Sequence, residues 1–325
     1  MRRKLWRTLF AAFLSLAVSS CGGSEPRVSG KSQVRVDVDW SGCADRVPQG
    51  MTILFHHQES GSVTSVIDNN VAYATTFLSP GRYRATVFNL TENEFDNIRF
   101  RGLGSADTAE AYLREAAPSK WHTAPYGDGG YVAGQPEWLA ADTILTPCVA
   151  APPPTEAGST IQIAGTLHPR TLTRNLHLIL HAGNISNLRS ARGALSGLAA
   201  GHRLAADMPN DNSVTVTHLI ESDNWKRLPE STEMGTVEAD IRCFGLPAGH
   251  NASPEENYLT FQALLADGKT VSEYIIPAGH LIRSTAGGLS LELWLDPPLP
   301  PRNDGGGIDV WFDDWDETID FNTKL

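Results

Sequence analysis

The sequence lacks the local signatures of the common catalytic and cofactor sites. It contains no Gly-x-Ser-x-Gly nucleophile elbow and no His-Glu-x-x-His zinc motif. The glycine run at 305–307 is not part of a Gly-x-x-x-x-Gly-Lys-Ser/Thr phosphate loop. Its four cysteines include no Cys-x-x-Cys pair, which argues against a zinc ribbon. We therefore expect a protein that is not an enzyme and that uses no metal, cofactor or small-molecule substrate.

Basic residues and long apolar runs are also scarce. The chain has 26 Lys and Arg against 37 Asp and Glu. Such an acidic surface repels nucleic acid and anionic headgroups, so no nucleic-acid partner is expected. After residue 21 no stretch approaches the roughly eighteen apolar residues of a membrane-spanning helix. A hydrophobic content of 41% is nonetheless enough to build real cores.

The short apolar run at the N-terminus has the order of a secretory signal. Basic residues within 2–7 come first, an apolar core at 9–18 follows, and small residues lead to Cys21. This order resembles the lipobox of bacterial lipoproteins, whose cysteine is acylated and becomes the first residue. We predict a signal peptide over 1–20, lipid attachment at Cys21 and a flexible tether over 21–32. The alternative is an ordinary signal peptide followed by a chance cysteine.

Processing at this position would make the protein more acidic. Four of the 26 basic residues would leave with the signal, so that 22 would face 37 acids, a formal charge of −15. Membrane attachment would then depend on the lipid rather than on charge.

Three cysteines would remain after acylation of Cys21. Export permits a disulfide, and Cys43 and Cys148 lie near the two ends of the first half of the chain. A Cys43–Cys148 bridge is one hypothesis. The alternative is that these two and Cys243 are small, buried and inert.

Alternation of apolar and polar residues predicts many short strands joined by Gly and Pro turns. The predicted strands are 34–40, 51–55, 72–77, 83–89, 98–101, 139–149, 160–165, 176–181, 214–220, 236–244, 258–266, 269–276, 289–295 and 308–312. Asp267-Gly268 between two of them is a specific hairpin signal. The Ala-rich stretch at 106–116, followed by Pro118, predicts the one helix. Residues 185–204 mix strand and turn signals and are left unassigned.

These patterns indicate an all-β protein of two sandwich domains. The run 151–158 contains three consecutive prolines, which favour a stiff, extended connector over a strand inside a sheet. We therefore expect an N-terminal β-sandwich over 33–150 and a C-terminal one over 159–325.

Histidines, acids and tryptophans supply few binding candidates. His177 and His181 would share a strand face, which favours a polar strand face over a metal site. The acidic residues after 308 do not follow the calcium-loop pattern and are interpreted as a solvated face. Trp121 and Trp138 lie in less regular stretches, where an exposed ring could stack on a sugar, although packing is the commoner role.

Several segments together resemble a known family. They are VRVDVDW at 34–40, PQGMTILF at 48–55, LSPGRYRATVFN at 78–89, SARGALSGLA at 190–199, CFG at 243–245, ADGK at 266–269 and GGIDVWFDDW at 306–315. In order and spacing they are similar to the DUF5119 lipoproteins of the Bacteroidetes, relatives of the FimB/Mfa2 fimbrial anchor proteins. The chain departs from the pattern at His202-Arg203 and in its acidic tail.

The resemblance implies two tandem transthyretin-like β-sandwiches on an outer-membrane lipid anchor, exposed at the cell surface. It also implies a role as a fimbrial anchor or accessory subunit. One hypothesis is therefore a structural protein that binds a pilin-like subunit by β-strand addition. The alternative is a surface glycan-binding lipoprotein, with Trp121 and Trp138 as the first candidates for contact.

Overall fold

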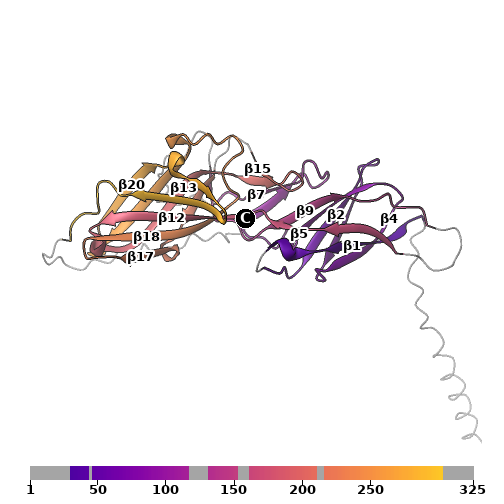
Figure 1. The fold of residues 1–325 in the computed structure, drawn as a ribbon, viewed down its shortest axis with the longest axis horizontal. Helices are drawn as coiled ribbons and strands as arrows, with labels where there is room; N and C mark the ends of the chain where they lie inside the picture. Colours follow the sequence, from indigo (N-terminus) through magenta and orange to yellow (C-terminus); the bar gives the residue numbers. More distant parts are fainter. Residues whose placement is uncertain (1–29, 44–45, 117–130, 153–160, 211–215, 303–325) are drawn as a thin grey trace, which may run out of the picture.

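The described part of the protein consists of β-strands and short 3-10 turns. The computed structural model describes residues 30–43, 46–116, 131–152, 161–210 and 216–302. No α-helix occurs in these ranges, and the all-β prediction is confirmed. Figure 1 shows an elongated molecule in which two β-sandwiches lie end to end.

The first sandwich packs a sheet of order β10-β1-β4 against a sheet of order β11-β9-β5-β2-β3. Their bounds are β1 (Ser32–Val38), β2 (Met51–His57), β3 (Val63–Asp68), β4 (Tyr73–Leu78), β5 (Tyr83–Asn89), β9 (Ala140–Leu145), β10 (Gln162–Leu167) and β11 (Arg170–Thr171). The alternation in β1 buries Val34, Val36 and Val38 on one face. They pack with Ile53 and Phe55 of β2 in the core between the sheets.

Strands from beyond the proline run also belong to this first sandwich. β10 pairs in parallel with β1, so that Val34 lies opposite Gln162 and Val38 opposite Leu167. β11 pairs with β9. The first sandwich therefore takes strands from both sides of the predicted linker at 151–158, of which residues 153–158 lie outside the described ranges.

The second sandwich packs a sheet of order β17-β18-β12-β22-β21 against one of order β20-β19-β13-β16-β8. The bounds are β8 (Tyr131–Ala133), β12 (Arg174–Gly183), β13 (Leu188–Leu198), β16 (Val216–Ile220), β17 (Trp225–Pro229), β18 (Met234–Cys243), β19 (Tyr258–Leu265), β20 (Val271–Pro277), β21 (Arg283–Thr285) and β22 (Gly288–Trp294). Leu176, Leu178 and Leu180 of the central strand β12 point into its core.

A small third sheet lies where the two sandwiches meet (Figure 1). Its order is β15-β14-β7-β6, formed by β6 (Ile98–Arg101), β7 (Glu110–Leu113), β14 (Gly201–Arg203) and β15 (Met208–Pro209). One apolar cluster joins this sheet to both sandwiches. It contains Leu54 and Phe88 from the first sandwich and Phe244, the residue that follows β18, and Phe88 and Phe244 are almost completely buried. The sandwiches are thus held together by a shared core.

The strand predictions were largely confirmed, including the hairpin of β19 and β20 around Asp267-Gly268. The predicted helix at 106–116 was wrong. Its residues 110–113 form β7, which lies between β6 and β14. Pairing on both sides supplies the backbone hydrogen bonds that a helix would have made, and this tertiary context outweighs the helix propensity of alanine. The unassigned stretch 185–204 contains β13, and β3 was missed. The predicted strand at 308–312 lies outside the described residues.

Candidate functional site

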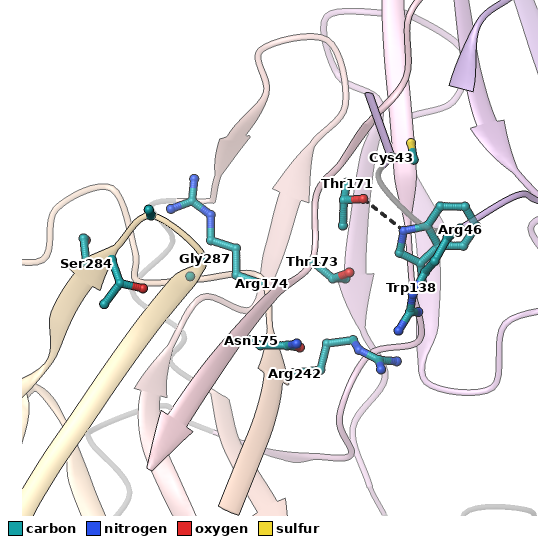
Figure 2. A pocket seen from close by; sticks show the side chains of 13 residues that line it. Cys43, Arg46, Trp138, Thr171, Thr173, Arg174, Asn175, Arg242, Ser284 and Gly287 are labelled. Atoms are coloured by element: carbon teal, nitrogen blue, oxygen red, sulfur yellow. Dashed lines mark hydrogen bonds between the residues drawn. The ribbon is translucent and has the colours of Figure 1, made fainter. Parts of the chain in front are cut away.

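A cleft of about 600 Å³ lies between the two sandwiches. The short connection from β11 to β12 crosses it, and Leu172 within this connection is buried in the shared core. The backbone N–H of Leu172 donates to the carbonyl of Leu139 at 2.8 Å, which fixes the crossing. The cleft is lined by Cys43, Arg46, Trp138, Thr171, Thr173, Arg174, Asn175, Arg242 and the turn 284–288 (Figure 2).

Trp138 forms the wall on the side of the first sandwich. Its indole Nε1 donates to the hydroxyl of Thr171 at 3.1 Å. Its carbonyl accepts from the side-chain amide of the buried Asn89 at 3.0 Å. The guanidinium of Arg46 lies over the indole, 5.9 Å from the ring centroid. Hydrogen bonds to residues of the first sandwich therefore fix the position of Trp138, and its ring makes a cation–π contact with Arg46.

Three arginines make the cleft electropositive. Figure 2 shows the side chains of Arg46 and Arg242 approaching each other from opposite sandwiches, while Arg174 points toward the turn 284–288. Burial lowers the pKa of Arg242, and the charge of Arg46 lowers it further, whereas Glu137 raises it. One carboxylate oxygen of Glu137 accepts the backbone N–H groups of Asp96 and Asn97, at 2.9 and 2.7 Å. Within the described ranges, neither Arg46 nor Arg242 forms an ion pair with a carboxylate.

Hydroxyl and amide groups supply the remaining polar lining. They belong to Thr171, Thr173, Asn175, Ser284 and Thr285. The turn from β21 to β22 comes this close because residue 288 is glycine. A Cβ at Gly288 would lie 2.2 Å from the carbonyl oxygen of Asn175, and its φ of +147° is one that side chains rarely adopt.

A second candidate surface is one lateral side of the first sandwich. There β3 pairs only with β2 and β4 only with β1, so each is the edge of its sheet. Residues 63–67 of β3 include no charged residue and no proline, which are the usual protections of an edge. Val63, Ser65 and Ile67 are exposed, and Ile67 has 64% of its surface accessible.

The backbone of β3 leaves hydrogen-bonding groups free at this edge. The N–H of His57 donates to the carbonyl of Ser62 at 2.9 Å, so these two residues form a hydrogen-bonded pair. Such pairs alternate along an antiparallel ladder. The N–H and C=O groups of Val63, Ser65 and Ile67 therefore point away from β2, toward the open side.

Two edges of the second sandwich carry the protections that β3 lacks. β17 contains Lys226, Arg227 and Pro229, and β20 contains Glu273 and Pro277. The register of the β1–β10 ladder shifts between Arg35 and Asp37, an irregularity that disfavours regular pairing. Among the regular edges described, β3 is well suited to accept a further strand.

The site residues predicted from the sequence do not form one cluster in the structure. Cys21 and Trp121 lie outside the described residues, whereas Trp138 lines the cleft. Cys43, Cys148 and Cys243 are free thiols, and Cys43 and Cys148 lie at opposite ends of β9. A strand of this length spans roughly 17–20 Å. Bridged cysteines need Cα atoms within about 7 Å, so this arrangement does not bring the two thiols together.

The paired histidines lie on the solvent face of the second sandwich. His177 contacts Asp240 at 2.9 Å, and His181 contacts Glu292 at 2.8 Å and stacks on Trp294. This is the polar strand face expected from the sequence. The described ranges contain no group of three or more His, Cys, Asp or Glu that could hold a metal ion. In the same ranges, no helix has the length and apolar character needed to cross a membrane.

Comparisons with known proteins point to one group. The model of the domain of unknown function DUF5119 matches residues 27–218. A Bacteroides ovatus protein named as fimbrium anchoring subunit Fim4B is 31% identical over 81 residues, which span 25% of this chain and 23% of that relative. Fewer than a quarter of the relative's residues are therefore compared.

Two solved structures illustrate the likeness in fold. One, described as an adhesin from Bacteroides ovatus, superposes with a TM-score of 0.55 and 16% identity, covering 87% of this chain and 99% of that one. The fimbrial anchor protein Mfa2 from Porphyromonas gingivalis gives a TM-score of 0.42 and 14% identity over 71% of this chain and 77% of its own. The Bacteroides ovatus structure supports a shared fold, whereas the structure of Mfa2 is too dissimilar to support any conclusion.

Proposed function

The chain belongs to the DUF5119 family, and on that premise we propose that it is an anchoring or accessory subunit of a bacterial fimbrium. It acts at the cell surface and binds a pilin-like subunit by β-strand addition. The observation that carries this proposal is the unprotected edge at β3, which offers outward N–H and C=O groups at Val63, Ser65 and Ile67. The relative named as a fimbrium anchoring subunit supports the same class of role.

Strand addition at β3 would use two kinds of contact. Main-chain hydrogen bonds to an added strand supply affinity without requiring a particular partner sequence. The exposed side chains of Val63 and Ile67 lie on one face, where alternate side chains of the added strand would pack. Specificity would come from these side-chain contacts.

One substitution separates strand addition from other modes of binding. Ser65→Pro removes an outward N–H while leaving the β2–β3 ladder intact, because proline is tolerated at an edge position that faces solvent. Ser65→Thr keeps the N–H and serves as the matched control. We expect the proline variant to bind purified fimbrial subunits from the same genome at least tenfold more weakly, and the threonine variant to bind normally. Equal binding by the proline variant would exclude addition at this edge.

We further propose that a lipid on Cys21 attaches the protein to the outer membrane. The support is the basic, apolar and small-residue order that precedes this cysteine. Cys21→Ser should move the protein from the membrane fraction to the soluble fraction and abolish labelling by a palmitate analogue. Cys148→Ser is the control, because that exposed thiol lies within the folded part. Retention of the Cys21 variant in the membrane would contradict lipid attachment.

A further inference from the structure

The cleft between the sandwiches concentrates positive charge in an otherwise acidic protein. The whole chain carries a formal charge of −11, yet Arg46, Arg174 and Arg242 all line this one space. The pKa of Arg242 is lowered mainly by burial and further by the charge of Arg46, which lies close to it in the cleft. The carboxylate of Glu137 offsets part of this positive charge but forms no ion pair with either arginine in the described ranges, so a bound anion would stabilise the two guanidinium groups further. Guanidinium groups bind carboxylates with two parallel hydrogen bonds.

The rest of the lining suits a ligand rich in hydroxyl groups. Thr171, Thr173 and Asn175 follow one another along the connection from β11 into β12 and face the same space (Figure 2). Hydroxyl and amide side chains both donate and accept hydrogen bonds, as sugar hydroxyls do. The volume of about 600 Å³ lies within the range of small-molecule sites.

An acidic peptide is a poorer match for this lining. A peptide bound in extended form uses a regular strand edge and apolar pockets for its alternate side chains. The edge strands beside the cleft, β11 and β21, have only two and three residues, and the longer strands that line it are paired on both sides. Trp138 is the one aromatic side chain in the lining, and because Arg46 lies over its ring, it does not offer an apolar pocket to a peptide side chain.

We propose that this cleft is a binding site for a carboxylated saccharide, such as a uronic-acid oligosaccharide. Arg46 and Arg242 hold the carboxylate, and Thr171, Thr173 and Asn175 hydrogen-bond the hydroxyl groups. The site draws on both sandwiches, so its shape depends on the shared core. It is separate from the β3 edge, and the two activities can fail independently.

The test titrates the purified protein with galacturonate and glucuronate oligosaccharides, with neutral galactose and glucose oligomers, and with sodium sulfate. Calorimetry reports affinity. We expect an acidic oligosaccharide to bind at least tenfold more tightly than its neutral counterpart. Arg46→Gln and Arg242→Gln should each weaken that binding at least tenfold, while Thr173→Val should weaken it without affecting sulfate.

Matched controls keep the result interpretable. Arg82→Gln makes the same chemical change at an exposed position at the far end of the first sandwich and should leave binding unchanged. Arg46 is itself exposed, so its variant should fold even if that of Arg242 does not. The proposal is overturned if no acidic saccharide binds, if neutral saccharides bind equally well, or if sulfate binds as tightly as the saccharide, which would mark an anion site only. Tighter binding of a peptide copied from the acidic residues 309–320 would also overturn it.

Discussion

Acid should destabilise this protein through a histidine that is buried in its neutral form. His218 in β16 is completely buried, and neither ring nitrogen has a hydrogen-bond partner among the described residues. Burial lowers its pKa to about 4, with the backbone of Arg242 partly opposing the shift. In the unfolded chain the same group titrates near 6.5. As the pH falls below about 6.5, His218 therefore becomes protonated in the unfolded state but stays neutral in the folded state.

The size of this effect follows from the difference in pKa. Each unit corresponds to about 1.4 kcal/mol, so His218 should cost the fold about 3 kcal/mol between pH 6.5 and pH 4. Stability from this group is fully present above pH 6.5 and is lost as the pH approaches 4. A second histidine, His202, has its pKa lowered to about 4 mainly by burial and should add a loss of the same sign.

Urea unfolding at pH 7.5 and pH 4.5 tests this reasoning. His218→Leu removes the proton site, so its loss of unfolding free energy on acidification should be smaller than that of the parent by about 2 to 3 kcal/mol. His280→Gln alters an exposed histidine and should behave like the parent. If the leucine variant loses as much stability as the parent, the buried neutral state of His218 is refuted.

Three further outcomes are expected. Phe244→Ala leaves a cavity in the shared core and should lower the free energy of unfolding, measured in urea titrations, by about 3–5 kcal/mol. An unchanged urea midpoint would contradict a packed junction between the sandwiches. Gly288→Ala should destabilise by more than about 1 kcal/mol, because its Cβ would collide with a β12 carbonyl, whereas Gly287→Ala has open space and should be neutral in thermal melts. In thiol titrations Cys148 should react in the native protein and the two buried cysteines only after unfolding. A single reactive thiol in unreduced denaturant would instead reveal a bridge.

Local patterns were enough to predict much of the fold. The alternation in β1 and the Asp267-Gly268 turn between β19 and β20 each depend on neighbouring residues, and both predictions were confirmed. The segment that became β7 failed because its partners are distant in sequence. It is four residues long and is held by β6 on one side and β14 on the other, and no window of the chain contains that information.

The cleft was beyond sequence analysis for a related reason. Trp138 was selected as an aromatic in an irregular stretch, but Arg46 and Arg242 carry no motif and lie far apart in the chain. They meet only because the shared core fixes one sandwich against the other. A charge cluster assembled by domain packing leaves no signal in local composition.

The parallel pairing of β1 with β10 has a mechanical consequence. Both strands run toward the junction. The chain enters at Ser32, and it leaves past Leu167 toward the second sandwich. A pull between the N-terminal end and the second sandwich therefore draws β1 and β10 in opposite directions along their common ladder. Its hydrogen bonds are then loaded together in shear rather than opened one at a time from an end. The β1–β10 ladder of the first sandwich therefore resists tension along the long axis of the molecule.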